Sequence, residues 1–251
     1  MSTQHRMSRK DKRKLRQEGI LDKQNKVVKG KFNIVNIQDY YTLTSKQQQV
    51  IESWDSGNHL VLHGLAGTGK TWLACWLALE TLLEGDSECN KTFLFRSVVP
   101  TRDMGFLPGN VKQKAAIYED PYRSICTELF HRGDAYDIVK QKNLLEFSTT
   151  SFLRGLTFDR SIIIADEINN MSFHELDSLI TRAGKHTRII LCGDFRQSDL
   201  QNSAERDGLM RFLKILNTIR GFDYFEFEED DIVRSKLVKD YIIAKHKSGY
   251  V

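Results

Sequence analysis

The sequence predicts an α/β fold in which a mostly parallel sheet is covered by helices on both faces. Short apolar runs alternate with helical patterns from about residue 42 onward, a glycine-rich turn joins the first run to a helix, and an acidic pair ends a later run. Such alternation is typical of strands joined by helical crossovers. Ligands of these sheets sit at the carboxyl ends of the strands, so the residues placed there are the candidate site.

Each expected element is defined by its hydrophobic period and its flanking turn residues. The expected strands cover residues 60–63, 92–95, 144–147, 161–165, 189–192 and 224–227. The expected helices cover residues 45–54, 70–83, 122–130, 173–182, 208–216 and 235–246.

Length and composition indicate one folded domain. At 251 residues with 40% hydrophobic content, the chain can bury one sizeable core, whereas two full α/β domains would be cramped. We expect a flexible basic extension over residues 1–38 and a single domain over residues 39–251.

The amino-terminal extension carries most of the positive charge. Residues 1–31 hold eleven Lys and Arg against three acidic residues, a net charge of +8, while the whole chain carries +4. Such a segment has too few apolar residues to fold alone and suits many weak contacts with phosphates. A solvated, solubilising tail is the alternative interpretation.

The four cysteines and the apolar runs exclude several classes of protein. Cys75, Cys89, Cys126 and Cys192 form no C-x-x-C pair, which argues against zinc and structural disulfides and suits a reducing cytoplasm. No apolar stretch approaches 18 residues, so we expect neither a membrane span nor a membrane partner.

The turn after the first strand is a phosphate-binding motif. Residues 64–71 match G-x-x-x-x-G-K-[ST] and run directly into a helix. The glycines let successive backbone N–H groups face a phosphate, the lysine adds a mobile charge, and the final hydroxyl is a ligand for Mg²⁺. The expected nucleotide-binding residues are Gly64, Leu65, Ala66, Gly67, Thr68, Gly69, Lys70 and Thr71.

Two later strands end in residues that complete a hydrolytic site. Asp166 and Glu167 follow the strand at 161–165, where the first suits Mg²⁺ together with Thr71 and the second suits activation of water. Gln197, in the loop after the strand at 189–192, has the donor and acceptor needed to sense a γ-phosphate. A polar loop that caps the next helix is the alternative for that segment.

These segments resemble the first core domain of superfamily 1 helicases, and more closely the compact, bacteriophage-type members of the PhoH-like ATPase family. The resemblance covers residues 42–246 and implies a RecA-like P-loop NTPase fold. It is carried by Gly64-Leu-Ala-Gly-Thr-Gly-Lys-Thr-Trp-Leu-Ala, Gly105-Phe-Leu-Pro-Gly, Ser151-Phe-Leu-Arg-Gly-Leu-Thr, Gly193-Asp-Phe-Arg-Gln-Ser-Asp and Asp231-Ile-Val-Arg-Ser-Lys-Leu-Val. Asn169 and Asn170 depart from the Gln-Asn common in the family.

The resemblance implies roles for four further residues. Gln47 stands where helicases read the adenine edge, with Gln48 and Gln49 as alternatives in the same helix start. Arg96 and Arg154 stand where related proteins contact nucleic acid or phosphate. Arg234 suits stabilisation of the transferring phosphoryl group, and a salt bridge to the acidic run at 228–231 is the alternative.

Taken together, we expect Mg²⁺-dependent ATP hydrolysis with Lys70, Glu167, Gln197 and Arg234 as catalytic residues, coupled to single-stranded nucleic acid, RNA rather than DNA. A superfamily 1 helicase closes its ATP site between two domains, and the second domain contributes arginines. Because this chain has one such domain, we expect a homohexamer in which each subunit presents Arg234 or another arginine to the site of its neighbour. A nucleotide-gated protein-interaction module without a nucleic-acid substrate is the alternative. We expect no companion nuclease domain, since the segments outside residues 42–246 are too short for one.

Overall fold

The computed structural model describes residues 42–85, 87–97, 111–150, 157–195 and 203–248, with the backbone alone for 111–117 and 203–206. Its strands are β1 (His59–Gly64), β2 (Lys91–Arg96), β3 (Leu145–Thr149), β4 (Ser161–Asp166), β5 (Arg188–Gly193) and β6 (Phe222–Phe227). Its α-helices are α2 (Ser45–Asp55), α3 (Lys70–Glu84), α4 (Val111–Phe130), α5 (Ala135–Gln141), α6 (Phe173–Thr181), α7 (Ser203–Leu216) and α8 (Lys236–Lys247). Short 3₁₀ turns, η2 (Ile168–Asn170) and η3 (Glu229–Asp231), follow β4 and β6.

The strands form one parallel sheet in the order β3-β2-β4-β5-β1-β6. β1 lies between β5 and β6, and β4 lies between β2 and β5. All carboxyl ends therefore meet at one edge. The turn after β1 and the acidic pair after β4 are separated there by β5 alone.

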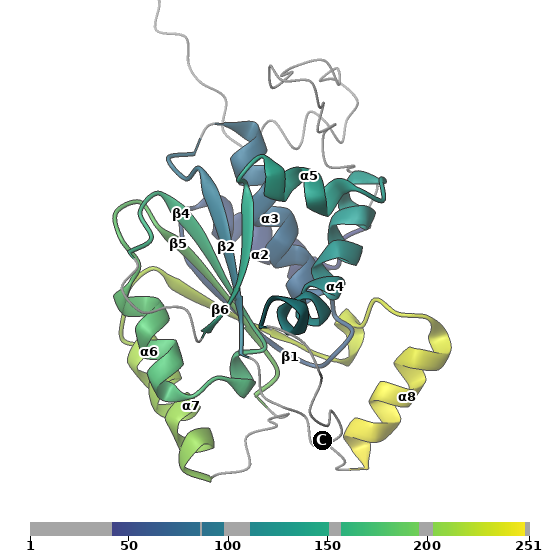
Figure 1. The fold of residues 1–251 in the computed structure, drawn as a ribbon. Helices are drawn as coiled ribbons and strands as arrows, with labels where there is room; N and C mark the ends of the chain where they lie inside the picture. Colours follow the sequence, from purple (N-terminus) through teal and green to yellow (C-terminus); the bar gives the residue numbers. More distant parts are fainter. Residues whose placement is uncertain (1–41, 86, 98–110, 151–156, 196–202, 249–251) are drawn as a thin grey trace, which may run out of the picture.

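The two faces of the sheet bury alternate residues of each strand. Leu60 and Leu62 of β1 pack with α2, α3, α4 and α5, whereas Val61 packs on the opposite face with α6 and α7. Figure 1 shows these two helical layers on either side of the sheet. The period of two in a strand places these side chains on opposite faces, and their burial confirms the predicted α/β class.

Local signals set several helix boundaries. Thr44 and Gln47 form a capping box at the start of α2, and Ser172 and Glu175 form another at the start of α6. α3 ends at Gly85, which adopts a left-handed conformation with φ of 67°.

The expected strands are all confirmed, and three helices differ from expectation. α7 begins at Ser203, before the expected start at residue 208. α4 begins at Val111 and passes through Pro121. The expected helix starts at residue 122, directly after this proline, and proline interrupts helical hydrogen bonding. α5 was not predicted, since its short sequence carries fewer than two helical turns of pattern.

Other expectations concern the cysteines and the membrane. All four cysteines are buried, in agreement with a packing role. Over the ranges that the structure describes, no helix has both the length and the apolar character needed to cross a membrane.

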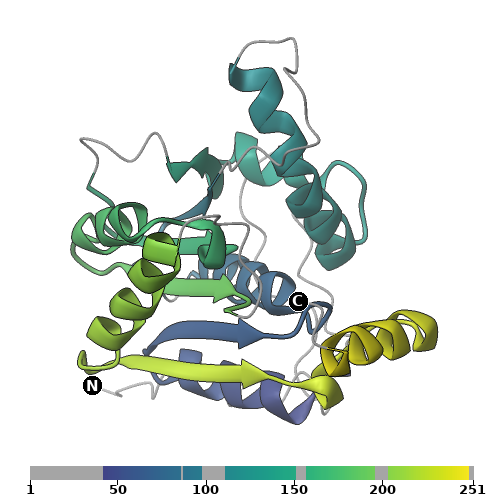
Figure 2. The ribbon, with the colours of Figure 1, turned by 90° about the horizontal axis from the view of Figure 1, so that it is seen from below.

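The last helix stands apart from the two layers. α8 extends beyond the carboxyl end of β6 (Figure 2), and none of its residues is buried. The carboxyl-terminal end of α8 contacts η3, because Glu229 pairs with His246 at 3.2 Å and with Lys247 at 3.6 Å. Val233 and Arg234, before α8, and Ile242 within it lie against the turn after β1.

Candidate active site

A pocket of about 670 Å³ opens at the carboxyl ends of the strands. This volume is within the usual range for small-molecule sites. Ala66, Gly67, Gly69, Lys70 and Thr71 line it from the turn after β1, and Asp166, Glu167 and Asp194 line it from the ends of β4 and β5. The position agrees with the general rule for parallel α/β sheets.

The turn between β1 and α3 depends on its glycines. Gly67 and Gly69 adopt φ of 75° and 82°, a left-handed conformation that side-chain-bearing residues rarely take. Gly64, at φ of 115°, lies so close to the Phe227 carbonyl that a Cβ would collide with it. Leu65 and Thr68 support the turn from behind: the Leu65 N–H donates to the Phe227 carbonyl, and the buried Thr68 hydroxyl donates to the Leu65 carbonyl.

Lys70 is held by the turn itself. Its ammonium donates to the carbonyls of Gly64 at 2.8 Å and Leu65 at 2.7 Å. Burial lowers the pKa of this ammonium, and the nearby Asp194 carboxylate opposes that shift. A phosphate placed in the turn would therefore meet a partly desolvated, oriented donor.

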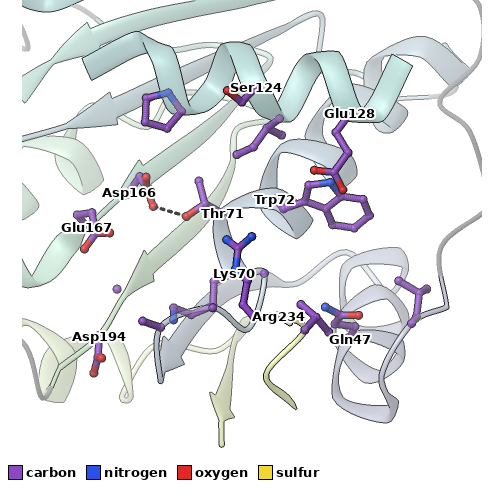
Figure 3. Close-up of a pocket in the computed structure, with 18 of the residues that line it drawn as sticks. Gln47, Lys70, Thr71, Trp72, Ser124, Glu128, Asp166, Glu167, Asp194 and Arg234 are labelled. Carbon is purple, nitrogen blue, oxygen red and sulfur yellow. Dashed lines mark hydrogen bonds between the residues drawn. The ribbon is translucent and has the colours of Figure 1, made fainter. Parts of the chain in front are cut away.

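Asp166 is oriented through both of its carboxylate oxygens. The Thr71 hydroxyl donates to Oδ1 at 2.7 Å, as drawn in Figure 3, and the buried Tyr122 hydroxyl donates to Oδ2 at 2.7 Å. Burial, followed by the charge of Asp166, raises the pKa of Tyr122, so the phenol remains a donor. Tyr122 was not among the expected site residues. The two residues are far apart in the sequence, and the sequence does not reveal that they lie close together in space.

Glu167 sits at the turn between β4 and η2 with φ of 55°. Burial, followed by the neighbouring Asp166 carboxylate, raises the pKa of Glu167, while Arg96 and Lys70 act in the opposite direction. A carboxylate with a raised pKa is a better proton acceptor than an exposed one.

Asn169 connects the turn after β4 to the end of β5. Its Oδ1 accepts from the Asp194 N–H at 3.0 Å, and a Cβ on Gly193 would lie only 2.9 Å from the same oxygen. Glu167 and Asp194 thus share one wall of the pocket. Asp194 is a second lining residue that the sequence analysis did not select, although it follows a strand end as Asp166 does.

Arg96 lies inside this pocket at the end of β2. Burial lowers the pKa of its guanidinium, but Tyr122, Asp166 and Glu167 raise it by more, so the group is firmly charged. This position favours the phosphate alternative for Arg96, and a contact with nucleic acid stays a prediction.

Gln47 lines the pocket, but both ends of its side-chain amide are engaged. Oε1 accepts from the Thr44 N–H at 3.0 Å, and Nε2 donates to the Thr68 carbonyl at 3.3 Å. The side chain is 4% exposed. These two bonds brace α2 against the turn. Each uses one N–H or one lone pair of the amide, so the expected contact with an adenine edge stays a prediction.

The segment before α8 holds the turn from the opposite side. The Val233 N–H donates to the Gly67 carbonyl at 3.0 Å, and Arg234 lines the pocket of its own chain. A Cβ on Gly67 would lie 3.0 Å from the Arg234 Cγ and 3.2 Å from the Ile242 Cδ1. Among the described residues, the ion pairs of the acidic run at 228–231 are those of Glu229 with α8.

Two expected site residues, Gln197 and Arg154, lie outside the described residues, as does the basic segment 1–31. Their expected roles stay predictions.

The residues present fit a nucleoside triphosphate with Mg²⁺. Gly67 and Gly69 give the turn its left-handed backbone, and the Lys70 ammonium lies at the same turn, on the carbonyls of Gly64 and Leu65. The Thr71 hydroxyl and Asp166 carboxylate are the hard oxygen donors that Mg²⁺ prefers beside phosphates. No group of three or more His, Cys, Asp or Glu side chains suited to a metal occurs within the described ranges.

The all-parallel sheet, the phosphate-binding turn after β1 and the acidic strand end at β4 define a RecA-like P-loop NTPase. The family model described as PhoH-like protein matches residues 40–245, and the chain belongs to this family.

Curated relatives agree with this assignment. A PhoH-like protein of Synechocystis sp. is 31% identical over 82% of this chain and 62% of its own length. A PhoH-like protein of Bacillus subtilis is 32% identical over 74% of this chain and 57% of its own. Protein PhoH of Escherichia coli K12 is 29% identical over 76% of this chain and 54% of its own. The matched part of this chain thus spans somewhat over half of each relative.

Two solved structures illustrate the partial similarity of the fold. The large terminase of a thermophilic bacteriophage, in complex with ADP, has a TM-score of 0.47 at 13% identity, over 80% of this chain and 49% of its own. Bacteroides Pif1 bound to ssDNA has a TM-score of 0.43 at 13% identity, over 84% of this chain and 47% of its own.

Proposed function

We propose that this chain hydrolyses ATP in a Mg²⁺-dependent reaction and couples hydrolysis to binding or remodelling single-stranded nucleic acid, with RNA as the expected polymer. The observation that carries the hydrolytic part is the 2.7 Å hydrogen bond between Thr71 and Asp166, with Lys70 and Glu167 in the same pocket. The residues proposed for phosphate binding, metal binding and water activation thereby line the same pocket.

The side chains divide the chemistry among them. Lys70 and the N–H groups of the turn bind the β- and γ-phosphates, and Thr71 and Asp166 hold the metal ion. When bound, Mg²⁺ neutralises charge that develops on the phosphoryl oxygens. Glu167 orients the attacking water and accepts its proton. Gln197 is expected to sense the γ-phosphate.

Arg234 acts, in this proposal, on the nucleotide of its own chain. Its contact with the position of Gly67 and its place in the pocket support a role in cis. An arginine that stabilises the transferring phosphoryl group typically contributes about 10³ to 10⁵ in rate. The homohexamer expected from the sequence stays a prediction, and in this account a neighbouring chain would supply another arginine.

The nucleic-acid part of the proposal is supported by the net charge of +8 over residues 1–31 and by the resemblance of the core to superfamily 1 helicases. Contacts between lysine or arginine and phosphates release counterions, so binding should weaken steeply with added salt.

The proposal is tested by steady-state ATP hydrolysis with and without single-stranded RNA and DNA, beside a Lys70→Ala control. Stimulation of several-fold by one polymer, absent in the control, is the expected result. Hydrolysis that no polymer changes would contradict the coupling to nucleic acid.

A nucleotide-gated protein-interaction module is the second candidate. The observation that favours it is the apolar surface of α8, where Leu237 is 80% exposed and Tyr241 is 68% exposed beside the segment that contacts the turn. Hydrolysis would then reset a protein contact, and polymer-independent turnover would be the expected result.

A further inference from the structure

The pocket has two ends of different chemical character. Asp166, Glu167 and Asp194 lie at one end, and Gln47, Trp72 and Glu128 lie at the other, with Lys70 between them (Figure 3). The acidic end suits the metal and the attacked phosphate. The remaining end is therefore where the base of a bound nucleotide must lie.

Trp72 is the aromatic side chain of that second end. It is half-buried and follows Thr71 directly in α3, so the phosphate-binding turn fixes its position. Its ring packs against Trp76 with centroids 5.2 Å apart, and it also lines the pocket. The ring is thus supported from behind and presented to the cavity.

Apolar side chains lie at this end of the pocket together with Gln47 and Glu128. Leu43 from the segment before α2 and Ile125 from α4 are both half-buried and line the same pocket. Val233 lies on the other side of the turn, with its Cγ2 3.6 Å from a Cβ position on Gly69. Such a lining suits the flat face of a nucleobase.

The side chain expected to read the base edge, Gln47, also makes two hydrogen bonds within the protein. Gln47 donates to the Thr68 carbonyl and accepts from the Thr44 N–H, so its amide serves the turn. Recognition by the face of the base would add to any contact that Gln47 makes with its edge.

We propose that Trp72 is the platform on which the purine base of the bound nucleotide stacks. The proposal rests on the proposed function, because it takes the phosphate positions from the turn after β1. Trp72 then contributes to affinity for nucleotides but not for phosphate chains that lack a base. Base–aromatic stacking is typically worth about tenfold or more in affinity.

The test compares a ligand with a base to one without. Calorimetric binding of the β,γ-imido analogue of ATP and of inorganic tripolyphosphate, both with Mg²⁺, is measured for the full chain and for Trp72→Leu, Trp72→Phe and Trp76→Phe. Trp76 is the matched control, since it is 5% exposed one turn further along the same helix and does not line the pocket.

Trp72→Leu should weaken binding of the ATP analogue about tenfold and leave tripolyphosphate binding unchanged. Trp72→Phe should retain most of the affinity, and Trp76→Phe should bind both ligands as the unmodified chain does. Equal weakening for both ligands, or no weakening for the analogue, would overturn the stacking role. Failure of the unmodified chain to bind either ligand would instead overturn the proposed function.

Intrinsic fluorescence gives a second readout, because the chain has three tryptophans. Stacking should quench emission when the ATP analogue binds, and the quench should persist in Trp76→Phe and vanish in Trp72→Leu. A quench that persists in Trp72→Leu would place the base elsewhere.

Discussion

The Tyr122 hydroxyl donates a 2.7 Å hydrogen bond to Asp166 Oδ2, and this bond links α4 to the end of β4. The other oxygen of the carboxylate accepts from Thr71. A residue that holds a metal ligand from behind fixes its direction without touching the metal, and such partners are commonly worth about tenfold or more. Tyr122 therefore belongs to the site as a positioning residue.

Tyr122→Phe should raise the Mg²⁺ concentration needed for half-maximal hydrolysis about tenfold, because Asp166 loses one of the two bonds that orient it. Titration of steady-state hydrolysis with Mg²⁺ measures this. Tyr136→Phe is the control, since Tyr136 is equally buried and donates to Glu119 at 2.9 Å, remote from the pocket. An unchanged Mg²⁺ requirement in Tyr122→Phe would remove the positioning role.

Gly67→Ala should abolish nucleotide binding. Its φ of 75° is strained for alanine, and the added Cβ would press on the Arg234 Cγ 3.0 Å away. Gly85→Ala is matched in backbone conformation, with φ of 67°, but its Cβ would meet nothing within 4 Å. The control should lose only about 1 kcal/mol of stability. Equal nucleotide affinity in both variants, measured by calorimetry, would contradict the packing of Arg234 on the turn.

Gln47→Ala should weaken binding of ATP and of inorganic tripolyphosphate alike, because Gln47 braces Thr68 and closes the cap of α2. Loss of the cap alone costs about 1 kcal/mol of stability. Gln48→Ala, at an exposed position in the same turn, should behave as the unmodified chain. If Gln47→Ala lost only its preference for ATP over GTP, the edge-reading role would be supported.

Arg234→Ala should slow hydrolysis about 10³-fold, the lower end for such arginines. Its action in cis is tested by mixing Arg234→Ala with Lys70→Ala. If Arg234 serves its own chain, the mixture has only the summed residual activity of the two variants. Recovery of activity on mixing would show that one chain completes the site of another, and light scattering of the same mixture would give the number of chains.

The strands were predictable because each is a short apolar run with a turn at its end. Successive buried side chains of a strand pack on alternate faces of the sheet. The turn at 64–71 was predictable from its sequence motif, and Asp166 was predictable from its position at the end of an apolar strand. Both signals are local in the sequence. The approach of the turn to Asp166 within 2.7 Å follows from the strand order, which local patterns do not contain.

Contacts between distant segments were beyond the sequence. Tyr122 approaches Asp166 because α4 packs on the same face of the sheet as α3, and α4 begins at Val111 and continues through Pro121. Gln47 was placed correctly at the pocket, but its partners Thr44 and Thr68 become visible only when α2 packs beside the turn. These partners depend on packing in three dimensions, and composition carries no information on it.

The central claim is that this pocket hydrolyses ATP with Glu167 as the group that activates water. Its most direct test measures ATP binding and turnover together in Glu167→Gln, which keeps the shape of the side chain and removes its basicity. The account predicts unchanged or tighter ATP binding with turnover reduced by about a hundredfold or more. Turnover equal to that of the unmodified chain would contradict it.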